Sequence, residues 1–379
     1  MKKTILITLC ILTSLAVLLP VFAYCQPANT YSSKQVILVS ENGEVLLERN
    51  SHEKRPIASM TKIMTLLCIY DAVDSGQISL DDKVIASSNA ASMGGSQVFL
   101  DADSTYIASE LVKSIIVCSA NDSCVAMAEH ICGNVDAFVQ RMNDKAEELS
   151  LANTHFENCT GLPSISQFSC ANDVAVMFLA LIRHPQYFQC SKIWMEDFAH
   201  PSGRVTGMTN TNKLVRFYDG CDGGKTGYTS EAQHCLAVTA KRGDTRFVAV
   251  VVAAPDSKTR FAEASALLNY GFANFENKKY LTNSDAIPSV RIDGGTQTTL
   301  TPTADGQLAL FQRKGENSNC HVEFDLPSKV KAPVKQGDVV GKATLKNVDG
   351  QVLSLVDLVA PCNVAAKSLW DYVEQIVAP

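Results

Sequence analysis

Ser59 and Lys62 are spaced so that they could perform nucleophilic chemistry together. Positions i and i+3 are neighbours on a helix, so the Lys62 amine can reach the Ser59 hydroxyl. A serine hydroxyl is a weak nucleophile until a base takes its proton. A lysine amine can act as that base when desolvation or a nearby cation lowers its pKa. The spacing therefore predicts Ser59 as nucleophile and Lys62 as general base.

The same SxxK spacing occurs at Ser51 and Lys54, but the surroundings differ. Ser51 lies among charged residues with no apolar helical pattern behind it, which is typical of a surface loop. Ser59 follows Pro56, a residue suited to a first helical turn, and precedes a stripe of apolar residues. Ser59 and Lys62 are therefore the better candidate pair.

Two further short motifs follow along the chain. Ser119-Ala120-Asn121 comes after an apolar stretch, and Lys225-Thr226-Gly227 is predicted to precede a strand. Lys225 could supply a second positive charge near Lys62. Ser119 and Asn121 could complete a hydrogen-bonded ring that relays the proton and holds a substrate amide. SxN also occurs at residues 87–89, whereas KTG occurs once.

The backbone around the nucleophile could stabilise developing negative charge. Ser59 is predicted at a helix N-terminus, where backbone N–H groups point outward. Its own N–H and that of Tyr228, which follows the KTG motif, could form an oxyanion hole. One such donor contributes about 100- to 1000-fold in rate.

In this order the three motifs resemble those of the penicillin-recognising serine enzymes. The sequence around them is similar to the low-molecular-mass D-alanyl-D-alanine carboxypeptidases, at residues 55–62, 119–130, 154–163, 222–231 and 267–275. Ala120 replaces the commoner glycine of the SGN motif, at a position whose side chain need not act. The resemblance is strong over residues 30–275 and looser beyond.

The resemblance implies both a fold and a reaction. The fold would be α+β, an antiparallel sheet flanked by helices as in serine transpeptidases and β-lactamases, followed by a small all-β domain. Ser59 would attack the peptide bond between the two D-Ala residues of a peptidoglycan stem peptide and form an acyl-enzyme. Lys225 and Thr226, with Gly227 and Tyr228, would bind the substrate, and its terminal carboxylate needs the cation. Arg260 has a weaker claim to assist. β-Lactam antibiotics would acylate the same serine.

Three other functions share parts of this pattern. A D,D-endopeptidase that cuts cross-linked peptidoglycan would use the same residues. A class A β-lactamase needs a glutamate in an ExxLN motif, and the nearest candidate, Glu148, lacks the asparagine. A catalytically silent wall-binding protein is disfavoured because every catalytic position is intact.

The chain begins with features of an export signal. Lys2 and Lys3 precede an apolar run that ends near Ala23, as in a secretory signal peptide over residues 1–23. Cleavage there leaves 31 basic and 39 acidic residues, a formal charge of −8. We therefore expect an exported protein at the cell wall or the outer face of the cytoplasmic membrane. No basic cluster stands out, which disfavours a nucleic-acid partner.

Cysteine and histidine usage bears on disulfides and metals. Of 13 cysteines, 12 would remain after cleavage, and several lie in apolar helical stretches. Free thiols that fill the core are favoured over disulfides, which stay an alternative. The seven histidines form no HxH or HxxxH pair, and no CxxC exists, so we expect neither metal nor cofactor.

These residues need a scaffold, which the 379-residue length allows to be two domains. The pattern predicts a hairpin at 35–50, helices at 56–74, 106–132, 135–150, 171–184 and 259–275, and strands at 235–240 and 247–254. We expect a catalytic domain at 30–276 and a small β-sandwich at 285–365, with strands at 288–362. Residues 367–379 are expected to form a short, amphipathic helix that either packs on the β-domain or contacts a membrane surface.

Overall fold

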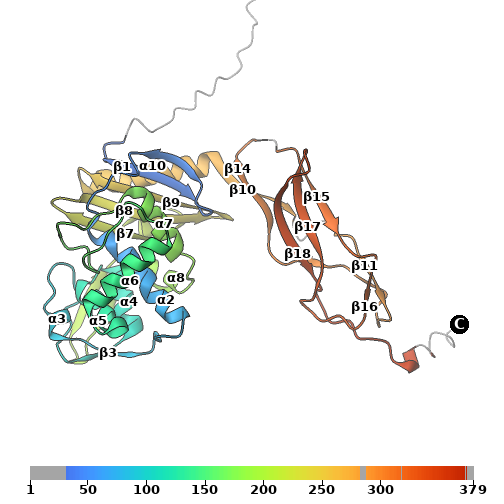
Figure 1. Ribbon diagram of the computed structural model, residues 1–379, viewed down its shortest axis with the longest axis horizontal. Helices are drawn as coiled ribbons and strands as arrows, with labels where there is room; N and C mark the ends of the chain where they lie inside the picture. The colour runs from blue at the N-terminus through green and yellow to red at the C-terminus, as the bar shows by residue number, and fades with distance from the viewer. Residues whose placement is uncertain (1–30, 282–286, 317, 372, 374–379) are drawn as a thin grey trace, which may run out of the picture.

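The computed structural model describes residues 31–281, 287–316, 318–371 and 373 (Figure 1). The expected signal peptide, residues 1–23, lies outside the described residues, as does most of the expected helix at 367–379. What is described of that helix is a first turn at residues 369–371. Among the described residues, none of the helices combines the length and the apolar character that crossing a bilayer would need.

A five-stranded antiparallel sheet forms the centre of the first part of the chain. Its strand order is β2-β1-β9-β8-β7. The strands are β1 (Gln35–Ser40), β2 (Val45–Arg49), β7 (Cys221–Thr229), β8 (Gln233–Arg242) and β9 (Thr245–Ala254). The predicted hairpin at 35–50 is confirmed, and Gly43 takes the positive φ of 85° that its tight turn needs. β7 lies at the sheet edge, which leaves one side of it open.

The sheet is covered on both faces, which explains why β9 is apolar throughout. Val248, Val250 and Val252 face a cluster of helices, whereas Phe247, Ala249 and Val251 face α10 (Ser257–Asn274) on the other side. Figure 1 shows α10 on one side of the sheet and the remaining helices on the other. Strand alternation places successive side chains on opposite faces, so both cores draw on one strand.

The helical cluster holds the Ser59 and Ser119 motifs at its boundary with the sheet. It consists of α2 (Lys62–Asp74), α3 (Ser88–Ala91), α4 (Ala108–Val117), α5 (Asn121–Cys132), α6 (Val135–Glu148), α7 (Ala171–Leu181), α8 (Tyr187–Ser191) and α9 (Leu214–Phe217). The single helix predicted at 106–132 is wrong. It is two helices, because Ser119 adopts a φ of +66° that no α-helix accommodates.

Two small antiparallel sheets of two strands each flank the helices. They are formed by β3 (Lys83–Ile85) with β4 (Thr105–Ile107), and by β5 (Met195–Ala199) with β6 (Val205–Thr209). The sequence analysis missed both. Their strands are short and partly exposed, so their apolar alternation is weak.

The chain after α10 is rich in strands. They are β10 (Phe275–Leu281), β11 (Val290–Asp293), β12 (Thr299–Leu300), β13 (Thr303–Ala304), β14 (Leu308–Arg313), β15 (Cys320–Asp325), β16 (Lys329–Lys331), β17 (Val339–Asn347) and β18 (Val352–Val359). They enclose two small cores, one around Leu345 and Leu358 and another around Ile292 and Val340. The first strand starts at Phe275, earlier than the expected 288, because two lysines interrupt the apolar pattern of β10.

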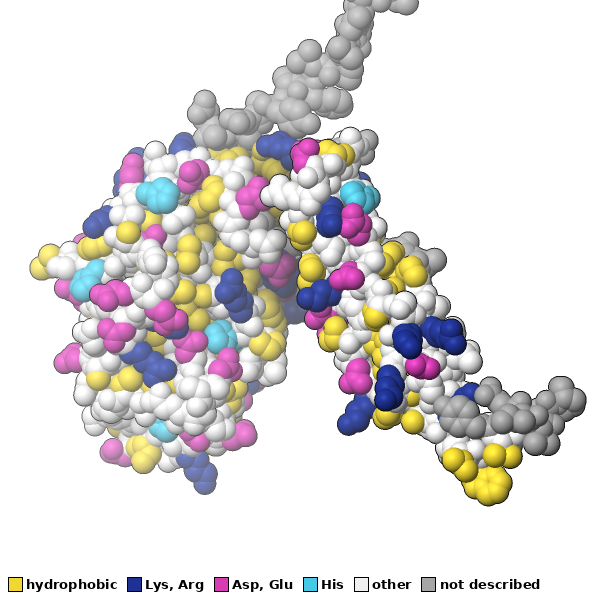
Figure 2. Space-filling view, turned by 45° about the vertical axis from the view of Figure 1, so that its right-hand side comes forward, with side chains coloured by type: hydrophobic (Ala, Val, Ile, Leu, Met, Phe, Trp, Pro, Cys, Tyr) yellow, Lys and Arg dark blue, Asp and Glu magenta, His cyan; other side chains and the backbone are white. Residues whose placement is uncertain are grey.

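The strand-rich part joins the first part through aromatic rings and polar contacts. Phe311 stacks on Phe275 with ring centroids 5.7 Å apart and contacts Phe247 at 6.2 Å. Lys279 pairs with Asp244 at 2.7 Å. Figure 2 shows side chains of both charge signs interspersed over the visible face of both parts.

The described cysteines, from Cys68 to Cys362, are all unpaired. Six are buried, among them Cys68, Cys124 and Cys159. Burial raises the pKa of the Cys124 thiol to about 12. These thiols therefore pack as small neutral side chains, in agreement with the favoured expectation.

Candidate active site

Ser59 and Lys62 meet as predicted, at the entry of α2. Ser59 lies in a 3-10 turn, Ala58–Thr61, that leads directly into α2. A 3-10 turn brings residues i and i+3 into line, and Lys62 Nζ lies 2.9 Å from Ser59 Oγ. Lys62 is fully buried, whereas Ser59 is partly exposed. A nucleophile that a ligand can reach is thus paired with a base that water cannot.

Lys62 has a second partner that the sequence analysis did not identify. Its Nζ donates to the backbone carbonyl of Thr160 at 2.5 Å. The carbonyl of the preceding residue, Cys159, accepts from Thr65 Oγ1 at 2.7 Å. The loop at 158–162 is therefore held along the first turns of α2.

Two glycines pack against the backbone of the nucleophile. A Cβ on Gly161 would lie 2.0 Å from the Ala58 carbonyl oxygen, and one on Gly227 would lie 2.5 Å from the Ile57 carbonyl oxygen. Ala58 itself has a φ of +48°, a strained value for a residue with a side chain. The turn that carries Ser59 is thus enclosed by two backbones that only glycine allows so close.

Lys225 and Ser119 form a second hydrogen-bonded pair. Lys225 Nζ donates to Ser119 Oγ at 2.8 Å and to the carbonyl oxygen of Thr226 at 3.0 Å. The KTG motif lies in the middle of β7, not before a strand as predicted. Its glycines and polar residues hide the strand pattern, and β7 runs at the sheet edge next to the Ser59 turn.

Asn121 opens α5 with its amide already oriented. Its backbone N–H donates to the Ser96 carbonyl at 2.7 Å, and its Nδ2 donates to the Gly94 carbonyl at 2.7 Å. Its Oδ1 is buried and has no hydrogen-bond partner in the described residues. A buried acceptor without a donor is costly, so this atom is suited to a ligand N–H.

The next residue, Asp122, fixes the loop that Asn121 contacts. Its buried carboxylate accepts the backbone N–H groups of Val98 and Leu100, each at 3.1 Å. Burial raises its pKa, while these N–H groups oppose that shift. The residue between them, Phe99, has a φ of +66° and is 54% exposed.

Both lysines of the site have lowered pKa values. Burial is the largest cause of the lowered pKa of Lys62. The pKa of Lys225 is lowered well below its usual value, first by burial and then by the nearby Lys62. Desolvation disfavours the charged form of an amine, so each lysine is closer to neutrality than an exposed one.

The remaining predicted residues and Arg260 surround Lys225. Thr226 is buried, and Tyr228 is 61% exposed with its ring 4.5 Å from that of His234. Arg260 on α10 is buried and donates to the Gly227 carbonyl at 3.2 Å. Its Nε has no partner in the described residues. The structure therefore places a third cation, Arg260, close enough to Lys225 to help lower its pKa.

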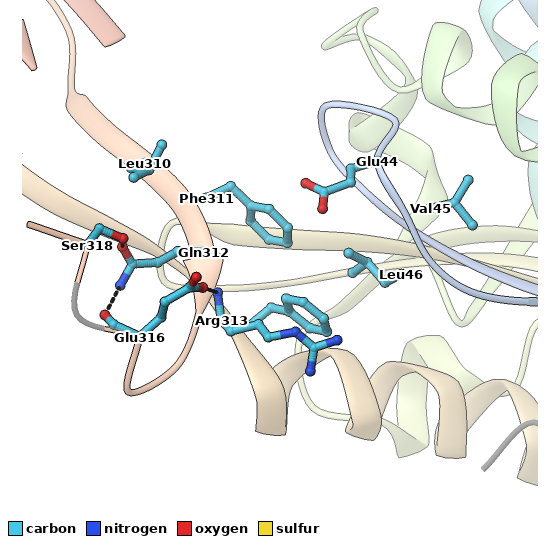
Figure 3. A pocket seen from close by; sticks show the side chains of 10 residues that line it. Glu44, Val45, Leu46, Leu310, Phe311, Gln312, Arg313, Glu316 and Ser318 are labelled. Carbon is cyan, nitrogen blue, oxygen red and sulfur yellow. Dashed lines mark hydrogen bonds between the residues drawn. The ribbon is translucent and has the colours of Figure 1, made fainter. Parts of the chain in front are cut away.

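The cavity in Figure 3 lies elsewhere, at the junction of the two parts. It holds about 370 Å³ between the β2 hairpin, with Glu44 and Leu46, and β14, with Phe311. Its lining hydroxyl, Ser318, donates to the Gln312 amide at 3.0 Å. This cavity contains none of the predicted site residues. Within the described ranges, no group of three or more His, Cys, Asp or Glu side chains is arranged to hold a metal ion.

Comparison with known proteins agrees with this geometry. The family profile described as D-alanyl-D-alanine carboxypeptidase matches residues 22–256. The chain belongs to the D-alanyl-D-alanine carboxypeptidase family. The C-terminal domain of penicillin-binding protein 5 matches residues 275–366.

Curated members of the family match most of the chain. D-alanyl-D-alanine carboxypeptidase DacF of Bacillus subtilis is 37% identical over 326 residues, covering 86% of this chain and 84% of DacF. D-alanyl-D-alanine carboxypeptidase DacD of Escherichia coli is 32% identical over 338 residues, covering 86% and 85%.

Solved structures of the family have the same architecture. Penicillin-binding protein 5 of Haemophilus influenzae is 30% identical with a TM-score of 0.66, covering 88% of this chain and 98% of that one. A peptidoglycan synthesis regulatory factor, PBP3, of Streptococcus pneumoniae is 27% identical with a TM-score of 0.70, covering 88% and 99%. The expected α+β fold of serine transpeptidases, with a strand-rich C-terminal part, is confirmed.

The glutamate of the β-lactamase alternative lies away from the carboxypeptidase site. Glu148 is the last residue of α6 and pairs with Lys145 at 2.7 Å. It lines a surface pocket with Asp71 and Asp144. It therefore has no partner among the motif residues and does not stand where a deacylating base would be needed.

Proposed function

We propose that the chain is a serine D-Ala-D-Ala carboxypeptidase in which Ser59 is the nucleophile and Lys62 its base. The enzyme removes the terminal D-Ala from peptidoglycan stem pentapeptides through an acyl-enzyme. The observation that carries the assignment of residues is the 2.9 Å contact between Ser59 Oγ and the fully buried Lys62 Nζ. Burial lowers the pKa of this amine and so favours its neutral form, which is the form that can accept a proton.

Acylation begins when neutral Lys62 takes the proton of Ser59 Oγ, which attacks the carbonyl carbon between the two D-Ala residues. The N–H groups of Ser59 and Tyr228 stabilise the resulting oxyanion. The C–N bond then breaks, and the proton moves from Lys62 to the amine of the departing D-Ala, with Ser119 as the relay. Water repeats the sequence on the ester and releases the shortened peptide.

Two polar groups orient the substrate for this attack. Asn121 Oδ1, which has no partner among the described residues, accepts the amide N–H of the stem peptide. The terminal carboxylate binds the ammonium of Lys225 and the hydroxyl of Thr226, with Arg260 behind them. These two donors and the nearby cation account for specificity toward a free C-terminus.

The paired lysines couple substrate binding to activation of the base. Lys62 helps to lower the pKa of Lys225, and two buried amines this close favour sharing a single positive charge. A bound carboxylate draws that charge to Lys225. Lys62 is then left neutral, as a general base must be. A β-lactam carries the same carboxylate and would activate the same serine.

Covalent labelling tests the assignment. The wild-type protein should form an adduct with a fluorescent penicillin, and Ser59→Ala should form none. An adduct in Ser59→Ala would show that another residue is the nucleophile. Release of D-Ala from a pentapeptide, compared with cleavage of a cross-linked dimer, separates the carboxypeptidase from an endopeptidase that would use the same residues.

The substrate fixes where the enzyme works. Stem peptides of peptidoglycan lie outside the cytoplasmic membrane, so the enzyme acts at the cell wall. In our proposal residues 30–276 form the catalytic domain, and the strands at 285–365 hold it at a distance from its attachment. An export signal over residues 1–23 delivers the chain there.

The end of the strand-rich part supports a peripheral membrane contact. Leu369 and Trp370 begin the expected helix at 367–379 and are 81% and 74% exposed. Apolar and aromatic side chains on a short helix favour the membrane interface. Sedimentation with phosphatidylglycerol vesicles tests the contact. We expect less protein to bind when Leu369→Ser and Trp370→Ser are combined in one variant than in the wild type. Equal binding by both proteins would argue against it.

A further inference from the structure

The segment Asn158–Leu162 touches the catalytic pair at two points. The Thr160 carbonyl accepts from Lys62 Nζ at 2.5 Å. The Gly161 backbone lies against the nucleophile, so that a Cβ there would stand 2.8 Å from the Ser59 nitrogen. Small displacements of this segment would therefore reach both the base and the backbone of the nucleophile.

One side chain that touches neither Ser59 nor Lys62 organises this segment. Asn158 Oδ1 accepts the Gly161 N–H at 2.7 Å, and the Thr160 N–H and Oγ1–H at 3.1 Å each. Its Nδ2 donates to the Leu162 carbonyl at 3.0 Å. An asparagine that binds its own following backbone in this way fixes a turn locally.

We propose that Asn158 is a positioning residue of the enzyme. Its amide fixes the turn that presents the Thr160 carbonyl to Lys62 and the Gly161 backbone to Ser59. This inference rests on the proposed roles of Ser59 and Lys62.

The carbonyl matters because of the shape of the base. A neutral amine has two N–H groups and one lone pair, and rotation about its last bond can aim the lone pair in several directions. When one N–H is held by the Thr160 carbonyl, fewer orientations remain, and the lone pair can be directed at the Ser59 hydroxyl. Fixing reactive groups in this way before the reaction lowers the entropic part of the barrier.

The second contact acts on the nucleophile itself. Ala58, directly before Ser59, has a φ of +48°, which an isolated chain would leave for a relaxed conformation. The close-packed Gly161 backbone opposes that relaxation. Asn158 holds Gly161 through the shortest of its four hydrogen bonds. Losing the amide should therefore loosen both members of the catalytic pair.

The test uses full-length protein and a fluorescent penicillin over a range of concentrations. This separates the dissociation constant of the first complex from the first-order rate of acylation. For Asn158→Ala we expect acylation to slow by about 10- to 100-fold. The dissociation constant should not change, because Lys225, Asn121 and Tyr228 are untouched. Asn158→Asp keeps the acceptor and should regain most of the lost rate.

Asn143→Ala is the matched control. Asn143 holds the chain two residues before this segment, through the N–H and the carbonyl of Phe156, both at 2.9 Å. We expect it to lower the unfolding temperature while acylating at the wild-type rate. If Asn158 served folding alone, the two variants would behave alike: acylation would be slowed in both or in neither.

Each outcome decides the proposal. Wild-type acylation by Asn158→Ala, or an equal loss in Asn143→Ala, would overturn it. If Asn158→Ala does not fold, a folded Asn158→Asp that has lost acylation would also overturn the proposal. Failure of the proposed function looks different, because the wild-type protein would then remain unlabelled or Ser59→Ala would be labelled.

Discussion

Gly161 offers a direct way to measure how tightly the nucleophile is held. Its φ is +82°, and a Cβ would stand 2.0 Å from the Ala58 carbonyl oxygen and 2.4 Å from the Ala58 carbonyl carbon. Both contacts are with backbone atoms, which cannot rotate away as a side chain can. Gly161→Ala therefore forces the loop at 158–162 and the Ser59 turn apart.

The loss of stability in Gly161→Ala has two separable parts. A residue with a Cβ in the left-handed region costs about 1–2 kcal/mol in free energy of unfolding. Overpacking adds about 1–3 kcal/mol. Because a Cβ is essentially never found within 3.0 Å of such an atom, the two backbones must separate by about 1 Å. A displacement of this size costs about 100-fold in rate when it reaches the reacting atoms.

Gly133→Ala separates the two parts. Gly133 has nearly the same φ, +79°, and ends α5, but nothing lies within 4 Å of its would-be Cβ. Chemical denaturation of both variants measures the loss of stability, and fluorescent penicillin measures acylation. We expect Gly133→Ala to lose only the backbone part and to acylate normally. Gly161→Ala should lose more stability and about 100-fold in acylation.

Equal losses of stability in the two variants, together with normal acylation by Gly161→Ala, would refute this reasoning. The Ser59 turn would then tolerate movement of its neighbour. A large loss of stability with normal acylation would mean that the loop moves away and leaves Ser59 in place.

Four other predictions follow from the described contacts. Lys62→Met, which keeps the volume of the buried side chain, should abolish penicillin labelling with little change in the far-ultraviolet circular dichroism; normal labelling would contradict the assigned base. In the wild-type protein, burial lowers the Lys62 pKa, so acylation should rise with pH through a midpoint below the ordinary lysine value of about 10.4, and a midpoint at that value would exclude Lys62. Arg246→Met should lose about 3–5 kcal/mol in urea unfolding, because Asp222, bound by two Arg246 nitrogens at 2.8 and 2.7 Å, would be left largely buried and unpaired; a loss like that of a surface pair would refute this. Hydrogen bonds that the His184 ring donates to Asp71 and Asp74 raise the pKa of His184, so the stability that the charged ring contributes should be complete below about pH 6.5 and lost as pH rises through the raised value; urea unfolding of wild type and His184→Gln should therefore differ most in acid, and a constant difference would disprove the link.

Local pattern was sufficient for most of the scaffold. The hairpin at 35–50 follows from an Asn-Gly turn between apolar runs, and α10 from a helical pattern that begins after the capping Asp256. Ser59 and Lys62 could be paired because their contact spans three residues. Interactions within one turn of a helix are encoded locally, so a single sequence reveals them.

Contacts between distant residues could not be derived in the same way. Thr160 reaches Lys62 across 98 residues, and its carbonyl belongs to the backbone, so no side-chain motif marks it. Gly161 is one glycine among 21, and only the path of the chain shows which needs its missing side chain. Residues 159–162 belong to a stretch that resembles the family, but the resemblance gives no physical reason for the glycine.

Two departures from expectation lie at the catalytic residues. The predicted helix 106–132 breaks at Ser119, and the KTG motif lies inside β7, whereas the strand predicted after it, at 235–240, is β8. In both places a local preference yields to the geometry of the site. Conflict between local pattern and observed structure is itself a sign of function.

Backbone strain links these departures to catalysis. Ala58 and Ser119 both have positive φ values, 48° and 66°, each of which costs about 1–2 kcal/mol. Neither residue would keep this conformation alone. Gly161 and Gly227 enclose the first, and the hydrogen bond from Lys225 holds the second. The reaction rate should therefore depend on packing partners that never touch the substrate, and substitutions there should slow acylation before they weaken binding.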